Sequence, residues 1–192
     1  VDVMQYCWKG DWPKNRAPSI MEISLNGENW KKNHPSNIIE YLLSPVPRKV
    51  KIVNFIFQKI FRINSEVPYM VHFTSSFNGD IKIGKDVCIY FANCGNSYFQ
   101  GINGIIIGDY TIIAPSVTII SANHDKNDFH IHEKADPVII GNKCWLGTNC
   151  VILPGVKLGD NVIVAAGSIV NKSFQSNVII AGNPAKIIKS LE

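Results

Sequence analysis

The residues best suited to chemistry lie around a polar stretch in the second half of the chain. His124 directly precedes residues 125–139, DKNDFHIHEKADPVI, which interrupt two regular apolar segments. A polar excursion of this length inside a regular fold is a typical place for a functional loop. An imidazole titrates near neutral pH and can take a proton from a hydroxyl group. His124 is therefore the first candidate for a general base.

Two more histidines in this stretch, His130 and His132, raise a metal site as an alternative. A zinc site needs three or four ligands that converge at about 2.0–2.1 Å. His130 and His132 are neighbours on one loop, which is a poor arrangement for convergence with His124. We therefore expect ordinary loop histidines and no bound metal.

A repeat of six residues indicates the element that positions His124. Aliphatic or aromatic side chains recur at this spacing in three series: Val71, Phe77, Ile83 and Ile89; Ile107, Ile113 and Ile119; and Ile140, Leu146, Ile152, Leu158, Val164 and Val170. This period fits neither a helix nor one long strand, but it fits a short strand followed by a corner. Three such sides close one coil, so the sequence predicts a parallel β-helix.

The predicted coils are residues 71–88, 89–106, 107–124, 140–157 and 158–175. In the second coil Gly95 and Gly101 occupy aliphatic positions, which predicts a bulge or an inserted loop there. Four residues after each aliphatic residue stands a compact side chain at Val87, Thr111, Val117, Cys144, Cys150, Val156, Val162 and Ser168.

The cysteines fit this repeat as fillers. Cys144 and Cys150 are six residues apart, as are Cys88 and Cys94, so we expect each pair at equivalent corners. A buried thiol behaves as a small apolar group. An odd total of five cysteines fits a reduced, cytoplasmic protein better than a disulfide framework.

Three segments resemble the hexapeptide-repeat acyltransferases, and most of all the maltose and galactoside O-acetyltransferases and the sugar acetyltransferases that decorate polysaccharides. The segments are IGDYTIIAPSVTIISANHD (107–125), IIGNKCWLGTNCVILPGVKLGDNVIVAAGSIVNKSF (139–174) and VIIAGNPAKIIKSL (178–191). The resemblance covers residues 70–192. It implies a left-handed parallel β-helix, a homotrimer, and transfer of acetyl from acetyl-CoA to a sugar, nucleotide sugar or glycan precursor.

The resemblance also implies roles for single residues. His124 matches the catalytic base, and Asn93 matches an asparagine that faces the reacting group. A third group would accept the other N–H of the imidazole, for which Glu133 is the first choice and Asp125 the second. The donor would contact the coils and tail at Trp145, Gly147, Thr148, Ala166, Asn171, Lys172, Lys186 and Lys189. The last two lysines match positions that are arginine in the sugar enzymes and meet the phosphates of coenzyme A.

The first 64 residues depart from the resemblance, and residues 1–70 are predicted to form an irregular and partly helical N-terminal segment that precedes the β-helix domain of residues 71–192. Ser36 is placed to cap a helix over residues 37–44. A second helix is predicted over residues 48–64, with Val50, Val53, Phe57, Ile60 and Phe61 at helical spacing among basic residues. We expect its apolar face to pack against the β-helix. The alternative is contact with an anionic membrane surface.

Composition excludes other classes of protein. Apolar residues make up 46% and charged residues 18% of the 192, which is typical of a folded single domain. No apolar window is long enough to span a bilayer, and the chain starts without the pattern of an export signal. The basic excess lies within residues 1–64, so nucleic-acid binding is not expected.

We therefore predict a cytoplasmic O-acetyltransferase with His124 as its base. Three alternatives remain at this stage. The acceptor atom could be a sugar amine, the β-helix could be a zinc lyase of the γ-carbonic anhydrase kind, or it could be a scaffold without activity. The sequence alone does not identify the acceptor molecule.

Overall fold

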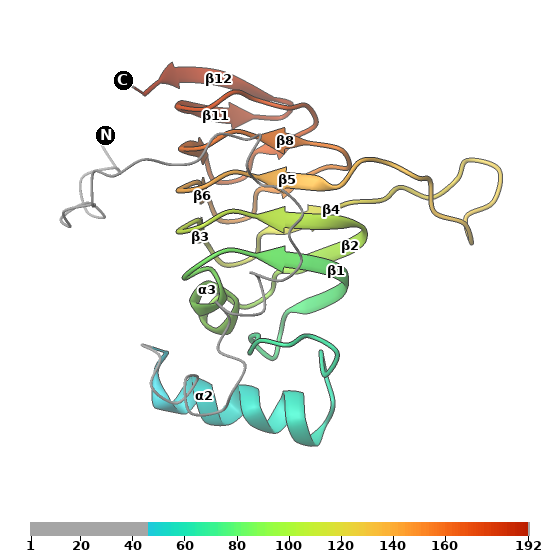
Figure 1. Ribbon diagram of the computed structural model, residues 1–192, viewed down its shortest axis with the longest axis vertical. Coiled ribbons are helices and arrows are strands. Elements are labelled where there is room, and N and C mark those ends of the chain that lie inside the picture. Colours follow the sequence, from blue (N-terminus) through green and yellow to red (C-terminus); the bar gives the residue numbers. More distant parts are fainter. Residues whose placement is uncertain (1–45, 192) are drawn as a thin grey trace.

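The computed structural model describes residues 46–191 (Figure 1). The helix predicted over residues 37–44 lies outside this range. The described helices are α2 (Arg48–Phe55), the π-helix η4 (Ile56–Ile60) and α3 (Cys88–Asn93). The strands are β1 (Ser76–Ile83), β2 (Tyr98–Ile107), β3 (Ile112–Ile113), β4 (Thr118–Ile120), β5 (Val138–Ile140), β6 (Trp145–Leu146), β7 (Val151–Ile152), β8 (Lys157–Leu158), β9 (Val162–Val164), β10 (Ile169–Val170), β11 (Val178–Gly182) and β12 (Ala185–Ser190).

The strands wind into the predicted parallel β-helix with three sides. One side is a sheet in the order β12-β11-β9-β6-β3, and a second sheet in the order β10-β7-β4-β2-β5-β8, with β1 on β2, supplies the other two. The second sheet covers two sides because residues 98–100 of β2 pair with β4, whereas residues 105–107 pair with β5. All pairs are parallel except β11 with β12. We call the sheet of β3, β6, β9, β11 and β12 the third side.

The six-residue repeat fills the interior as predicted. Leu146, Ile152 and Val170 are fully buried, and the eight compact corner residues are at most 2% exposed. Cys144 and Cys150 belong to this core, and burial raises the pKa of each thiol to about 12. These two cysteines are therefore apolar fillers, as the sequence indicated.

The second coil departs from the prediction in one respect. The short helix α3 replaces a strand on the third side, so Cys88 and Cys94 lie at the start of a helix and just after its end rather than at coil corners. Ile89 is consequently only half buried. The predicted bulge is confirmed, because the pairing of β1 with β2 shifts between Gly79 and Ile81, opposite Gly101 and Ile105.

Side chains tie consecutive coils together at one corner. The Asn142 Oδ1 accepts the Asp109 N–H at 2.8 Å, and the Asp160 Oδ1 accepts the Asn142 N–H at 2.7 Å. A Cβ at Gly141 would lie 2.6 Å from Asp160 Oδ1 and 2.5 Å from the Gly159 carbonyl oxygen. The glycine that opens this turn therefore leaves room for the side chain of the next coil.

The predicted helix over residues 48–64 is present as α2 and η4, which together end at Ile60. Its expected packing is only partly correct. Val50, Val53 and Phe57 are half buried, but Ile60 and Phe61 are exposed. Within residues 46–191, no helix combines the length and apolar character that crossing a bilayer requires.

Candidate active site

The polar loop projects from the corner between β4 and β5, where the two sides of the larger sheet meet (Figure 1). It occupies residues 121–137, slightly earlier than predicted, because β5 begins at Val138. The two loop segments nearest the coil stack are joined by a short antiparallel ladder of backbone hydrogen bonds. Asp125 donates its N–H to the Ile131 carbonyl at 2.8 Å, and Glu133 donates to the Asn123 carbonyl at 2.9 Å.

His124 lies in this ladder, opposite His132. The centroids of the two imidazole rings are 4.5 Å apart, with the planes inclined at 36°. His124 is exposed and His132 is half buried. The structure thus holds His124 at the rim of the corner, where a hydroxyl group from solvent can approach its ring.

The two carboxylates considered as partners of His124 differ in their contacts. Asp125 accepts the N–H groups of Asn127 and Asp128 at 2.7 and 3.2 Å, which turns the loop. Glu133 is half buried, and its main chain makes hydrogen bonds where the loop joins the coil stack. Among the residues described, no hydrogen bond joins either carboxylate to the His124 ring. No group of three potential metal ligands occurs within residues 46–191.

The residue that anchors this loop, Asn103, was not predicted from the sequence. It lies in the bulge of β2, and its Nδ2 donates to the carbonyls of Ser121 and Glu133, each at 2.9 Å. Its own N–H donates to Ser121 Oγ at 2.9 Å. Gln100 adds a buried bond, because its Oε1 accepts the Ala122 N–H at 3.0 Å. The break of the repeat at Gly101 was the only available signal for this anchor.

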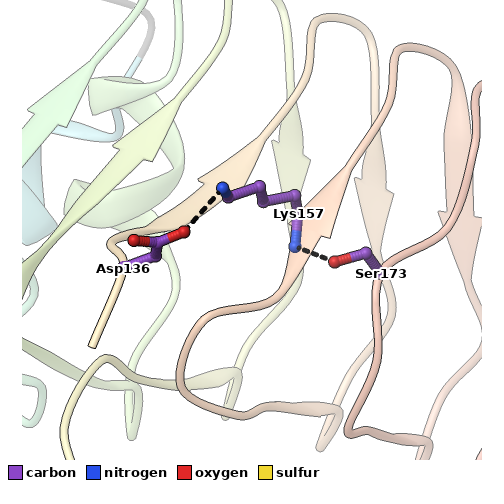
Figure 2. A network of polar contacts seen from close by, with 3 residues as sticks. All are labelled: Asp136, Lys157 and Ser173. Carbon is purple, nitrogen blue, oxygen red and sulfur yellow. Dashed lines mark hydrogen bonds and ion pairs between the residues drawn. The ribbon is translucent and has the colours of Figure 1, made fainter.

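The returning end of the loop is held by an ion pair. Figure 2 shows Asp136 beside Lys157, with Lys157 Nζ 2.8 Å from Asp136 Oδ2 and the Lys157 N–H donating to Ser173 Oγ at 2.9 Å. The Lys157 ammonium lowers the pKa of the Asp136 carboxyl by a hydrogen bond and by its charge. Both ends of the loop are therefore attached to the coil stack.

Asn93 lies far from this corner along the coil. It is the last residue of α3, on the third side beneath β3, and its exposed amide donates to the Ile89 carbonyl at 3.1 Å. The corner position expected from the repeat is thus replaced by a helix end. The structure does not bring Asn93 and His124 of one chain together.

The third side carries a row of large residues that crosses its strands. The register aligns Ile112 of β3 with Trp145 of β6, then with Ile163, Ile179 and Lys189. These residues point away from the core, because their neighbours Leu146, Val164 and Ile180 fill it, but Ile179 is itself only 4% exposed. Trp145 is 36% exposed at this face. The row therefore ends at one of the two predicted phosphate-binding lysines.

Beside this row runs a second one made of small residues, which we call the small-residue row. It consists of Ala114, Gly147, Ala165 and Ala181, linked by backbone hydrogen bonds between neighbouring coils, and Ala181 pairs with Lys186. A Cβ at Gly147 would lie 2.7 Å from the Ala166 nitrogen, so the coils approach closely here. The result is a shallow outer face with large residues on one flank and lysine at its end.

A bulge in β12 places both lysines on this face. Ile179 pairs with Lys189 and Ala181 with Lys186, and the register shifts between Ile179 and Ile180. Residues two apart on β11 share a face, and cross-strand partners share it with them. The extra residue, Ile188, therefore brings Lys186 and Lys189 to the same outer surface.

The remaining predicted donor residues divide between two places. Thr148 and Ala166 lie at the corner next to Gly147, where Thr148 Oγ1 donates to the Pro115 carbonyl at 2.7 Å. Asn171 and Lys172 follow β10, at the corner from which the loop projects, and both are exposed. The predicted residues thus form two groups, one with His124 and one on the third side.

The two groups lie on opposite parts of a triangular coil. The corner that holds His124 joins the two sides of the larger sheet, so the third side lies across the buried core from it. Figure 1 agrees, with the loop on one flank and β3 and β6 on the other. One chain therefore cannot bring His124 to the small-residue row.

Comparisons with known proteins identify the family. Residues 137–172 match the family described as "Bacterial transferase hexapeptide (six repeats)". The chain is 34% identical to galactoside O-acetyltransferase of Escherichia coli (strain K12) over 132 residues, 67% of this chain and 62% of that protein. It is 30% identical to "Putative acetyltransferase SAV2555" of Staphylococcus aureus (strain Mu50 / ATCC 700699) over 152 residues, which cover 78% and 73% of the two chains.

Among solved structures, a galactoside acetyltransferase in complex with coenzyme A superposes with a TM-score of 0.54 at 25% identity, covering 75% of this chain and 80% of that one. The chain spans less than two thirds of the length of several curated relatives, galactoside O-acetyltransferase among them. The predicted fold class, a left-handed parallel β-helix with a projecting loop, is confirmed. This chain belongs to the hexapeptide-repeat family of bacterial transferases.

Proposed function

We propose that the protein transfers acetyl from acetyl-CoA to a hydroxyl group of a sugar or glycan precursor. The names of its relatives support the reaction class, and a neighbour of the same fold binds coenzyme A. The observation that carries the proposal is the division of the predicted residues into a histidine corner and a donor face. Cys144 and Cys150 are buried core fillers, as expected of cysteines in a reduced protein, which supports the cytoplasm as its compartment.

The proposed mechanism uses His124 as a base and then as an acid. Its imidazole would accept the hydroxyl proton while the sugar oxygen forms a bond to the acetyl carbon. It would then return that proton to the departing sulfur, so the proton balance closes without a covalent enzyme intermediate. Asn93 from another chain would donate a hydrogen bond to the acetyl oxygen as it gains charge.

The residues of the third side fit coenzyme A. The small-residue row places no large side chain over this strip of the third side, which suits a narrow chain such as pantetheine, and Trp145 provides an apolar flank. Lys186 and Lys189 place two cations at the end of this path, where phosphates would bind. Lysine keeps the charge of arginine but lacks its two-pronged geometry.

The double substitution Lys186→Ala and Lys189→Ala is expected to weaken coenzyme A binding and to reduce its dependence on salt. Exposed charge pairs are screened by ions, so removing them removes the salt-sensitive part of the affinity. Titration calorimetry at two salt concentrations measures both effects. Lys143→Ala with Lys126→Ala removes the same charge elsewhere and serves as the control. Unchanged affinity in the Lys186 and Lys189 variant would make these lysines ordinary surface charges.

The acceptor atom is expected to be oxygen. A neutral base is needed most when the nucleophile is an alcohol, whose proton must leave as the bond forms. The product itself provides the test, because mild alkaline hydroxylamine cleaves acetyl esters and leaves acetyl amides intact. Loss of the acetyl group from the purified product would support the proposal. An acetylated product that survives would assign the enzyme to amine acetylation.

A further inference from the structure

α2, η4 and the residues directly after them expose large apolar side chains beside their basic ones, which is unusual for a surface helix. Ile52, Ile60 and Phe61 are 61%, 63% and 63% exposed, and Ile63 is 43% exposed. We call these four residues the apolar patch. The patch lies at the end of the coil stack opposite β12 (Figure 1). Clustered apolar side chains on a protein surface mark an interaction site more often than isolated ones do.

Polar residues fix this orientation from the inside. Asn54 is fully buried, donates to the Ala92 carbonyl at 2.9 Å and accepts the Phe73 N–H at 3.2 Å. Gln58 is 2% exposed and donates to the Tyr69 carbonyl at 2.9 Å. Rotating the helix to bury the patch would break these buried bonds, and each orphaned group would carry a desolvation penalty. The outward position of the patch is therefore specified by the sequence.

The charged residues within residues 47–64 all have one sign, and the first acidic residue after them is exposed Glu66. Arg48, Lys49, Lys59 and Arg62 are exposed on the same helical segment. The sequence from residue 47 to residue 64 contains no aspartate or glutamate. An apolar helical face bordered by lysine and arginine is complementary to the surface of an anionic lipid bilayer. A second copy of the same segment would instead bring like charges together.

We propose that α2 and η4 dock the protein on an anionic membrane surface. The isoleucine and phenylalanine side chains enter the boundary between headgroups and acyl chains, and the four cations contact lipid phosphates. The helix lies in the interface and does not span the bilayer. Docking at this end of the stack leaves the loop corner and the third side open to their substrates.

Flotation of the full chain with vesicles tests this proposal. Vesicles of phosphatidylcholine with about 30% phosphatidylglycerol are compared with phosphatidylcholine alone, at low and high salt. We expect binding to the anionic vesicles that weakens with salt, because surface charges are screened. Ile52→Gln with Ile60→Gln removes apolar contact while keeping good helix formers, and is expected to lower binding at least tenfold. Lys49→Gln with Lys59→Gln is expected to lower it by about 30-fold.

A control for both variants removes one isoleucine and one lysine from another exposed site. Ile131→Gln with Lys126→Gln changes the projecting loop, and its vesicle binding should equal that of the parent protein. Circular dichroism and the thermal midpoint establish that every variant is folded. Failure of the parent protein to bind anionic vesicles overturns the proposal, as does equal binding by the Ile52 and Ile60 variant. A smaller particle by light scattering in that variant would instead assign the patch to an interface between chains.

Discussion

Replacing His124 with alanine is expected to lower kcat by about 10²–10⁴, the usual effect of losing a positioned general base. Coenzyme A affinity should stay near that of the parent protein, because the residues proposed to hold coenzyme A, Lys186 and Lys189 among them, do not include His124. Steady-state kinetics with an acceptor sugar, together with calorimetry of coenzyme A binding, separate the two effects.

The matched control for this substitution is His130→Ala. His130 is an exposed histidine on the same loop, and its N–H donates to Asp128 Oδ1 at 2.9 Å through the main chain, which alanine retains. Its turnover should therefore change little. Parent turnover in the His124 variant would remove this residue from the mechanism and leave the loop without an assigned base.

Two inactive variants are expected to restore activity when they assemble together. His124→Ala removes the base, and Ala165→Phe fills the small-residue row on the third side. In the proposed homotrimer each site takes its base from one chain and its donor face from the next. In trimers that contain both variants, about one third of these boundaries combine an intact base with an intact donor face. Co-expression with two different affinity tags should recover activity of this size from the mixed assemblies.

The control for this complementation mixes two chains that both lack the His124 imidazole. His124→Ala mixed with a chain carrying both His124→Ala and His130→Ala has no intact base, so no activity should return. Light scattering of the parent protein gives its oligomeric state independently. Recovery in the first mixture alone supports a shared site. A fully active monomer, or no recovery in either mixture, contradicts it.

The six-residue repeat predicted much of the fold because each repeat is set by the packing of one side chain into the coil interior. Each aliphatic residue fills the same position in successive coils, and side chains such as Leu146 and Ile152 are buried for that reason. The helix α3 escaped prediction because CIYFAN still satisfies the six-residue spacing at Ile89. Spacing constrains which residue points inward, but it does not require the backbone between two such residues to be extended.

The site was predictable to a different extent. The position of His124 beside a polar loop followed from the sequence, as did the lysines of the tail. The anchor of the loop did not, because Asn103 contacts residues 18 and 30 positions further along the chain. The buried face of α2 and η4 was also predicted wrongly in part, since buried hydrogen bonds of Asn54 and Gln58 outweigh the apolar spacing. Polar contacts between distant segments leave no periodic trace in a sequence.

The antiparallel strand β12 has a consequence for the solubility of the whole molecule. A stack of parallel coils ends in unpaired backbone groups, which can recruit the edge of another molecule and grow into a fibre. Here β12 covers β11, breaks its own pairing register at Ile188 and carries Lys186 and Lys189 on its surface. A bulged and charged last strand is a poor template for a further coil. The tail that we assign to phosphate binding therefore also protects this edge of the sheet against end-to-end polymerisation.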